Sequence, residues 1–259
     1  MKKNNYKEIF EKVEETLLQI PGKKEEVERF KNPTEWNFSD DRIFTNLVHI
    51  IFYSGFRASV VDDKLDIINN HFPNYEIVSN YDESDIHRIM SDSNMIRNEL
   101  KIQGIINNSK VFKTIVNKHK SFKNYLELFN VSESFENLLL LKEELQYKFE
   151  FLGEITVFHL LTDLGFPVLK PDRVLTRIFK RLDLIENERQ LLKTIIQGRK
   201  FANATGNHIR YVDIIFVTYG QMGKKNSEGL ERGICLAQNP QCSLCQINEH
   251  CSFFKNNYA

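Results

Sequence analysis

The chain has 259 residues, and its 35 lysines and arginines balance its 35 aspartates and glutamates, so the formal net charge at pH 7 is zero. This balance excludes a general electrostatic attraction to nucleic acid, so any DNA-binding surface must be local. Hydrophobic residues make up 41% of the sequence, enough for a sizeable core in one large domain or two small lobes. We expect a cytoplasmic protein with no membrane partner, because no run is apolar enough to span a bilayer or to act as a signal peptide.

Helical periodicity dominates the sequence. Two charged amphipathic helices are predicted within residues 6–31, with a break at Pro21-Gly22. A connector with Pro33 and Trp36 leads to a strongly apolar helix over residues 43–53. No stretch shows convincing period-two alternation, so the predicted fold class is all-α.

A glycine turn joins two further predicted helices. Leucines at helical spacing fill residues 135–148, and apolar residues at the same spacing follow Gly153, so we expect Gly153 to end one helix and open the next. Amides at the start of the second helix would face outward at the positive end of the helix dipole, which binds phosphate. Gly153, Glu154 and Thr156 are therefore candidate DNA-binding residues.

A second candidate segment begins at Asp172. It opens an amphipathic basic helix that carries Arg173 and Arg177, which are candidate DNA contacts. The plain interpretation of Asp172 is a helix N-cap, and this stretch alone leaves a capping and a functional role equally open.

All four cysteines lie in the last 25 residues, as Cys235, Cys242, Cys245 and Cys251. Four thiolates in one short segment satisfy a tetrahedral metal site or an iron–sulfur cluster. Two disulfides are disfavoured in an intracellular chain, which leaves structural zinc as the better competitor of a cluster. Four-cysteine zinc sites usually come as two short knuckles, a pattern that the spacing C-x6-C-x2-C-x5-C does not follow.

That spacing resembles the 4Fe–4S loop of endonuclease III and of the A/G-mismatch glycosylase. The hairpin followed by Asp172 likewise resembles the helix-hairpin-helix DNA glycosylases of the endonuclease III superfamily. The resemblance covers roughly residues 40 to 255. It implies a two-lobed fold, a 4Fe–4S cluster on the four cysteines with structural zinc as the alternative, and Asp172 as the catalytic carboxylate.

Other segments resemble a second branch of the same superfamily, the 3-methyladenine DNA glycosylase I group. They are the block around Gly55, IRNELKIQGIINN at residues 96–108 and YKFEFLG at residues 147–153. A flipped base needs a flat apolar slot, so Phe52, Tyr53 and Phe56 are candidate base-pocket residues. The alternative is hydrophobic core, which we favour for Phe52 and leave level with the pocket for the other two.

Two departures qualify these resemblances. Endonuclease III-type lyases place a lysine after the hairpin glycines, where this chain has Glu154 and Ile155, so the resemblance does not extend to lyase activity. The glycosylase I group has an N-terminal cysteine and a zinc site, whereas this chain has no cysteine before Cys235 and carries the Asp172 that the group lacks.

The resemblance implies a monofunctional DNA glycosylase of base excision repair that acts on alkylated purines, such as 3-methyladenine, in double-stranded DNA. The alternatives are a mismatch, uracil or oxidised-purine glycosylase, a non-catalytic cluster-bearing DNA-binding protein, and a zinc-stapled helical interaction module. We expect a nucleoid-associated monomer. Its predicted lobes are residues 42–165, and residues 1–41 with 166–259, the latter carrying the cluster loop at 235–251.

Overall fold

The computed structural model describes residues 5–20, 22–31, 38–221 and 233–258. In those ranges every regular element is helical and no strand occurs, which confirms the all-α prediction. The chain forms two compact units, Met1–Glu35 with Pro167–Ala259, called here the terminal unit, and Trp36–Phe166, called the middle unit. Pro21 and the connector predicted around Pro33 and Trp36 lie outside the described residues.

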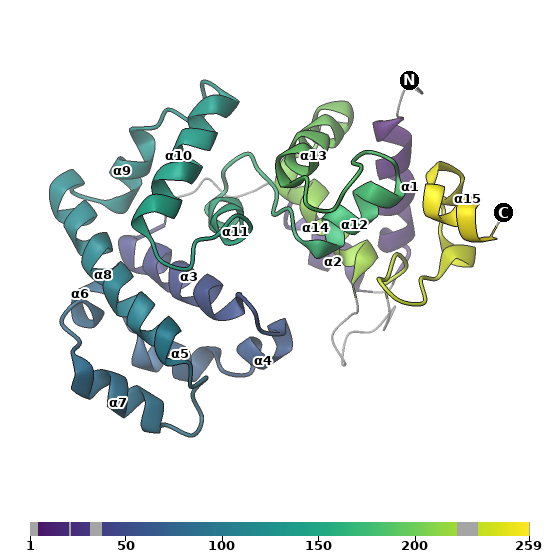
Figure 1. Cartoon of the computed structure of the whole chain (residues 1–259). Helices are drawn as coiled ribbons and strands as arrows, with labels where there is room; N and C mark the ends of the chain where they lie inside the picture. The colour runs from purple at the N-terminus through teal and green to yellow at the C-terminus, as the bar shows by residue number, and fades with distance from the viewer. Residues whose placement is uncertain (1–4, 21, 32–37, 222–232, 259) are drawn as a thin grey trace. The chain divides into compact units, whose positions relative to one another are not determined.

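The middle unit is built around its longest helix, α8, which packs against α3, α6 and α9 (Figure 1). Phe112 on α8 stacks on Phe122 with ring centroids 4.2 Å apart, and it meets Phe44 of α3 edge-on. These buried rings form the centre of the unit's core. The helices are α3 (Asp40–Tyr53), α4 (Ala58–Asp62), α5 (Leu65–His71), α6 (Tyr75–Val78), α7 (Glu83–Ser91), α8 (Glu99–His119), α9 (Phe122–Glu127), α10 (Phe135–Lys148) and α11 (Thr156–Asp163).

The terminal unit combines the two ends of the chain. Helix α14 packs against α1, α12 and α13, so residues from both ends share one core (Figure 1). The rings of Phe179, Phe201 and Phe216 meet within 5.4 Å of one another, and all three are fully buried. Its helices are α1 (Tyr6–Leu18), α2 (Lys23–Glu28), α12 (Arg173–Arg181), α13 (Leu191–Thr205), α14 (Ile209–Gly220) and α15 (Ser252–Tyr258), with 3₁₀ turns at Cys242–Leu244 and Asn248–His250.

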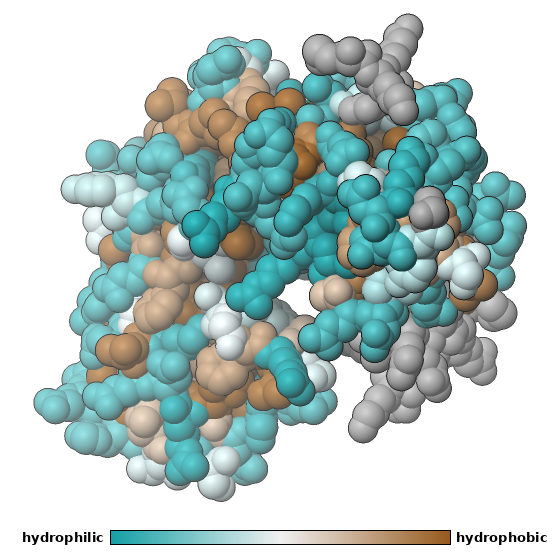
Figure 2. All heavy atoms as spheres, turned by 45° about the vertical axis from the view of Figure 1, so that its right-hand side comes forward, coloured by the Kyte–Doolittle hydropathy of each residue, from teal (hydrophilic) through white to brown (hydrophobic). Residues whose placement is uncertain are grey.

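The surface carries no continuous apolar belt on the face drawn in Figure 2, where hydrophobic residues form separate patches among hydrophilic ones. In the described ranges, no helix combines the length and the apolar character that a membrane span requires.

One side chain of α8 holds the turn between α10 and α11. Asn108 is 1% exposed, its Oδ1 accepts a hydrogen bond of 2.8 Å from the Glu150 amide, and its Nδ2 donates one of 2.9 Å to the Glu150 carbonyl. Both backbone groups of one turn residue are thus satisfied by a single buried amide. This two-point contact fixes where the turn lies on α8.

We predict that Asn108→Ala lowers the free energy of unfolding by about 1–3 kcal/mol, because it removes two part-buried hydrogen bonds to the backbone of Glu150. Chemical denaturation measures the change. Asn107→Ala is the matched control, since Asn107 is partly exposed and donates only to the Glu150 carboxylate. Equal losses in the two variants would contradict the role given to Asn108.

Candidate functional site

The turn between α10 and α11, residues 149–155, is called here the hairpin turn. Helix α10 ends at Lys148 and α11 begins at Thr156, so the expectation that Gly153 ends one helix and opens the next is wrong. Phe151, and not Gly153, adopts the left-handed conformation, with φ 65°, that turns the chain here. Thr156 Oγ1 closes the turn by donating to the Phe151 carbonyl at 2.8 Å.

Among the residues that the structure describes, the first amides of α11 are not used by the chain itself. Gly153 and Glu154 are exposed, and within the described residues the amides of Glu154, Ile155 and Thr156 donate no hydrogen bond to the chain. The next amide, that of Val157, is already used by the Gly153 carbonyl. The Glu154 carboxylate is held 3.1 Å from Lys142 Nζ, which neutralises part of its repulsion toward an anion.

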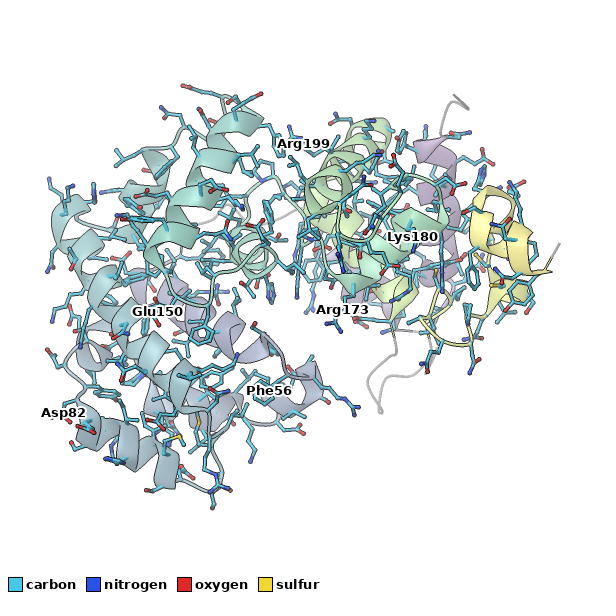
Figure 3. All side chains as sticks on the ribbon, in the orientation of Figure 1. Phe56, Asp82, Glu150, Arg173, Lys180 and Arg199 are labelled. Atoms are coloured by element: carbon cyan, nitrogen blue, oxygen red, sulfur yellow. The ribbon has the colours of Figure 1, made fainter. Side chains whose placement is uncertain are left out.

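The aromatic segment at the end of α3 divides between core and surface. Phe52 is fully buried and its ring lies 6.0 Å from that of Phe72, so it occupies the core position that we favoured. Tyr53 is partly buried and donates a 2.6 Å hydrogen bond to Asp62, while burial raises the pKa of its hydroxyl and keeps it protonated. Phe56 is 38% exposed, beyond the left-handed Gly55, and is the ring of the three most available to a base (Figure 3).

Asp172 is the N-cap of α12. Its Oδ1 accepts hydrogen bonds from the Val174 and Leu175 amides at 2.8 and 3.1 Å. The capping interpretation is therefore correct, but it occupies one oxygen only. Oδ2 accepts no hydrogen bond within the described residues, and the side chain is partly exposed, so a carboxylate oxygen remains available to a substrate.

The charge of Asp172 acts on a second carboxyl, which no motif in the sequence marks. Asp213 on α14 is fully buried, with Oδ2 2.7 Å from Arg210 and no partner for Oδ1 among the described residues. Burial raises the pKa of Asp213 to about 7, and the charge of Asp172 adds to the rise. The only sequence signal was a lone aspartate at an apolar position of a helix.

The two candidate arginines of α12 behave differently. Arg173 is exposed and projects from the helix together with Lys180, beside a hollow of about 660 Å³ (Figure 3). Arg177 is half-buried, and its guanidinium donates to the Gly220 carbonyl at 2.6 Å and to the Cys235 carbonyl at 3.1 and 3.2 Å. Arg177 thus fixes the cysteine loop, and its role as a DNA contact stays a prediction.

The four cysteines of the loop at residues 235–251 line one small cavity and form no disulfide. Three of their sulfurs accept hydrogen bonds from the surrounding chain, which orients them. The donors are Arg181 Nη1 to Cys235 at 3.2 Å, the Tyr219 hydroxyl to Cys245 at 3.3 Å and the Phe254 amide to Cys251 at 3.4 Å.

Four thiolates around a single zinc ion would lie roughly 3.8 Å apart, given a Zn–S bond of about 2.3 Å. Among the described residues, no three cysteine sulfurs lie within 4.8 Å of one another. The four cysteines fit a metal group by their donor type and by the cavity that they share.

The model of the methyladenine glycosylase family matches residues 22–167, more than half of the chain. The chain belongs to the methyladenine glycosylase family. The match takes in the aromatic segment, α8 and the hairpin turn. Asp172 and the four cysteines lie beyond it, in a part of the chain that the family pattern does not describe.

Solved structures of DNA glycosylases resemble this chain. The 8-oxoguanine DNA glycosylase of Thermotoga maritima is 16% identical over 86% of this chain and 99% of its own, with a TM-score of 0.54, which shows the fold. A 3-methyladenine DNA glycosylase I in complex with 3-methyladenine is 22% identical over 57% of this chain and 88% of its own, with a TM-score of 0.46. That of Staphylococcus aureus is 22% identical over 53% and 80%, with a TM-score of 0.44.

The cap at Asp172 predicts a difference between two variants. Asp172→Ala should lower the free energy of unfolding by about 1 kcal/mol, because two α12 amides lose their acceptor. Asp172→Asn should cost much less, because asparagine caps helices about as well as aspartate. Thermal or chemical denaturation checks both, and an equal loss in the two variants would mean that the charge, not the cap, stabilises this helix.

Proposed function

We propose that this member of the methyladenine glycosylase family is a monofunctional DNA glycosylase of base excision repair, which hydrolyses the N-glycosidic bond of alkylated purines such as 3-methyladenine. The observation that carries the proposal is the family match over residues 22–167. The exposed ring of Phe56 supports it, because an extruded base stacks on aromatic side chains.

The hairpin turn supplies the DNA contact in this proposal. The amides of Glu154, Ile155 and Thr156 lie at the positive end of α11, where a phosphate oxygen accepts their hydrogen bonds. Backbone amides hold any sequence equally well, which suits an enzyme that must scan duplex DNA for damage. The exposed Arg173 adds a charged contact from the terminal unit.

Asp172 supplies the chemistry. When the C1′–N bond breaks, the base leaves with the bonding electrons and the sugar gains oxocarbenium character, which a nearby carboxylate stabilises. The oxygen of Asp172 that the helix cap does not use can also accept a proton from the water that attacks C1′. A cationic alkylated purine is already a good leaving group, so the enzyme needs no general acid of its own for it.

No lyase step belongs to the proposal. A lyase forms a Schiff base through an amine near C1′, and the two residues after Gly153 are Glu154 and Ile155. Borohydride should therefore trap no covalent complex between the wild-type protein and abasic DNA.

We also propose that the four cysteines hold a 4Fe–4S cluster, with structural zinc as the alternative. The all-thiolate donor set, the cavity that the four cysteines share and their C-x6-C-x2-C-x5-C spacing support the cluster. When bound, it would close the cysteine loop covalently around one metal group and so stabilise the terminal unit. Arg181 and Tyr219 would donate to its thiolates, which orients the ligands and tunes their basicity.

The catalytic proposal predicts that Asp172→Asn slows base release by about a hundredfold or more, because a preorganised negative charge is lost while the cap is kept. Single-turnover release of 3-methyladenine from alkylated duplex DNA measures the rate, and binding to DNA with an abasic-site mimic should be retained. The loss should be smaller for a cationic base than for a neutral one, since the former is partly activated. A folded Asp172→Asn variant that releases base at the wild-type rate would show that the catalytic carboxylate is another residue.

The same assay decides the substrate. Mass analysis of the bases released from a duplex pool with alkylated, oxidised, mismatched and uracil lesions should show alkylated purines. Release of only oxidised, mismatched or uracil bases would show that the enzyme acts on that lesion and not on alkylated purines. A protein that binds the DNA but releases no base would favour a non-catalytic binder.

The cofactor proposal predicts that Cys242→Ser loses iron and destabilises the cysteine loop, because all four thiolates are needed to enclose the cluster. Iron and sulfide analysis together with visible absorption of the purified protein measures the first effect, and proteolysis of the terminal unit measures the second. Ser243→Ala, beside it in the loop, is the matched control. Zinc with no iron in the wild type would select the alternative.

A further inference from the structure

A buried lysine of the middle unit takes no part in the proposed mechanism. Lys101 on α8 is 6% exposed, and its Nζ donates to the carbonyl of Ile51 and, at 2.6 Å, to that of Ser54. Among the described residues no carboxylate acts on its charge. Burial of an ammonium group without a carboxylate is costly, and two hydrogen bonds to carbonyls at the end of α3 offset only part of that cost.

Two aromatic rings complete the surroundings of this ammonium group. Lys101 Nζ lies 5.4 Å from the ring centroid of Phe56 and 5.5 Å from that of Phe151. Phe56 is the exposed ring that follows α3, and Phe151 is the left-handed residue of the hairpin turn. The cation is therefore shared by the segment proposed to bind the base and the segment proposed to bind a phosphate.

The face of α8 that carries Lys101 is shaped to receive the hairpin turn. Residues 101, 104 and 108 lie on one side of the helix. A Cβ on Gly104 would lie 2.5 Å from the Phe151 ring, so only glycine allows this approach, and Asn108 binds the backbone of Glu150. The ring of Phe151 thus lies against α8 beside the ammonium group.

We propose that Lys101 is a positioning residue for base binding. Its ammonium group holds the turn after α3, residues 54–57, and the hairpin turn in one arrangement. The proposal rests on the proposed function and adds a residue to the same site. Lys101 acts through the two rings and the carbonyls at the end of α3 and is not placed against the reacting atoms.

The charge of Lys101 is sensitive to pH. Burial lowers its pKa to about 8, and no charged group contributes to the shift. The ionisable groups on the elements around it have other partners, since Tyr53 donates to Asp62, Glu150 accepts from Asn107, and His159 lies 3.3 Å from Asp163. The ammonium group, and with it the link between the two turns, should be lost as pH rises through about 8.

The same shift affects stability with the opposite sign. Between about pH 8 and the usual lysine pKa of 10.5, the unfolded chain keeps the proton that the folded chain has released. The contribution of Lys101 to the free energy of unfolding therefore rises with pH across that window, while the two turns become less protected from hydrogen exchange. A lysine with a purely structural role would not make these two measurements change in opposite directions.

The test compares Lys101→Met with Lys113→Met, a partly buried lysine of the same helix that donates to Ser79. We expect kcat/KM for 3-methyladenine release to fall as pH rises through about 8 in the wild type and in Lys113→Met. Lys101→Met should be roughly tenfold slower at neutral pH and flat across this range. Hydrogen–deuterium exchange of residues 54–57 and 149–155 should be faster in Lys101→Met than in the wild type at pH 7, and equal at pH 9.

The outcomes separate the two proposals. If the wild type releases no base at any pH, the proposed function is wrong. The hydrogen–deuterium exchange of the two turns still decides the role of Lys101. An active Lys101→Met that keeps the inflection near pH 8 and the protection of both turns overturns the positioning role. If Lys101→Met does not fold, the wild-type exchange series alone decides, because unchanged protection of the two turns from pH 7 to 9, after correction for intrinsic rates, contradicts the proposal.

Discussion

The contact on which the candidate site depends most is the pair of hydrogen bonds between the Asn108 side chain and the backbone of Glu150. A turn of seven residues between two helices has many conformations, and fixing one costs conformational entropy. A buried amide that satisfies both the N–H and the C=O of one turn residue offsets that cost at a single point. The Phe151 ring against Gly104 extends the contact by one helical turn, and the amides at the start of α11 are thereby presented to solvent.

A comparable constraint acts in the terminal unit, where one short helix serves two purposes. Its first turn is capped by Asp172, and its later turns carry Arg177 and Arg181, which hold the cysteine loop by its carbonyls and by the sulfur of Cys235. The candidate catalytic carboxylate and the candidate metal ligands are therefore coupled through α12. A metal group on the cysteines would stabilise the support of Asp172 without taking part in the reaction, which is consistent with a structural role.

The family match and the cysteine loop lie in different parts of the chain. Residues 22–167 carry the methyladenine glycosylase pattern, with the aromatic segment and the hairpin turn, whereas Asp172 and the cysteines follow it. In this chain an aspartate and a candidate metal loop follow the segment that carries the pattern of that family. The buried Asp213, on which the charge of Asp172 acts, adds a second carboxyl whose protonation changes near neutral pH.

Local pattern in the sequence was enough to predict the helices, the gathering of the four cysteines and the cap at Asp172, because helical periodicity, cysteine spacing and N-capping each depend on residues a few positions apart. Phe52 is buried and Phe56 is exposed because Phe52 packs against Phe72, just beyond α5, and because the chain turns at Gly55. Periodicity reports neither feature. The helical pattern places Arg177 on the surface, yet its guanidinium donates hydrogen bonds to carbonyls 43 and 58 residues away in the chain. Lys101 was hidden for the same reason, since segments from either side of it in the chain surround its ammonium group, and only tertiary packing brings them together.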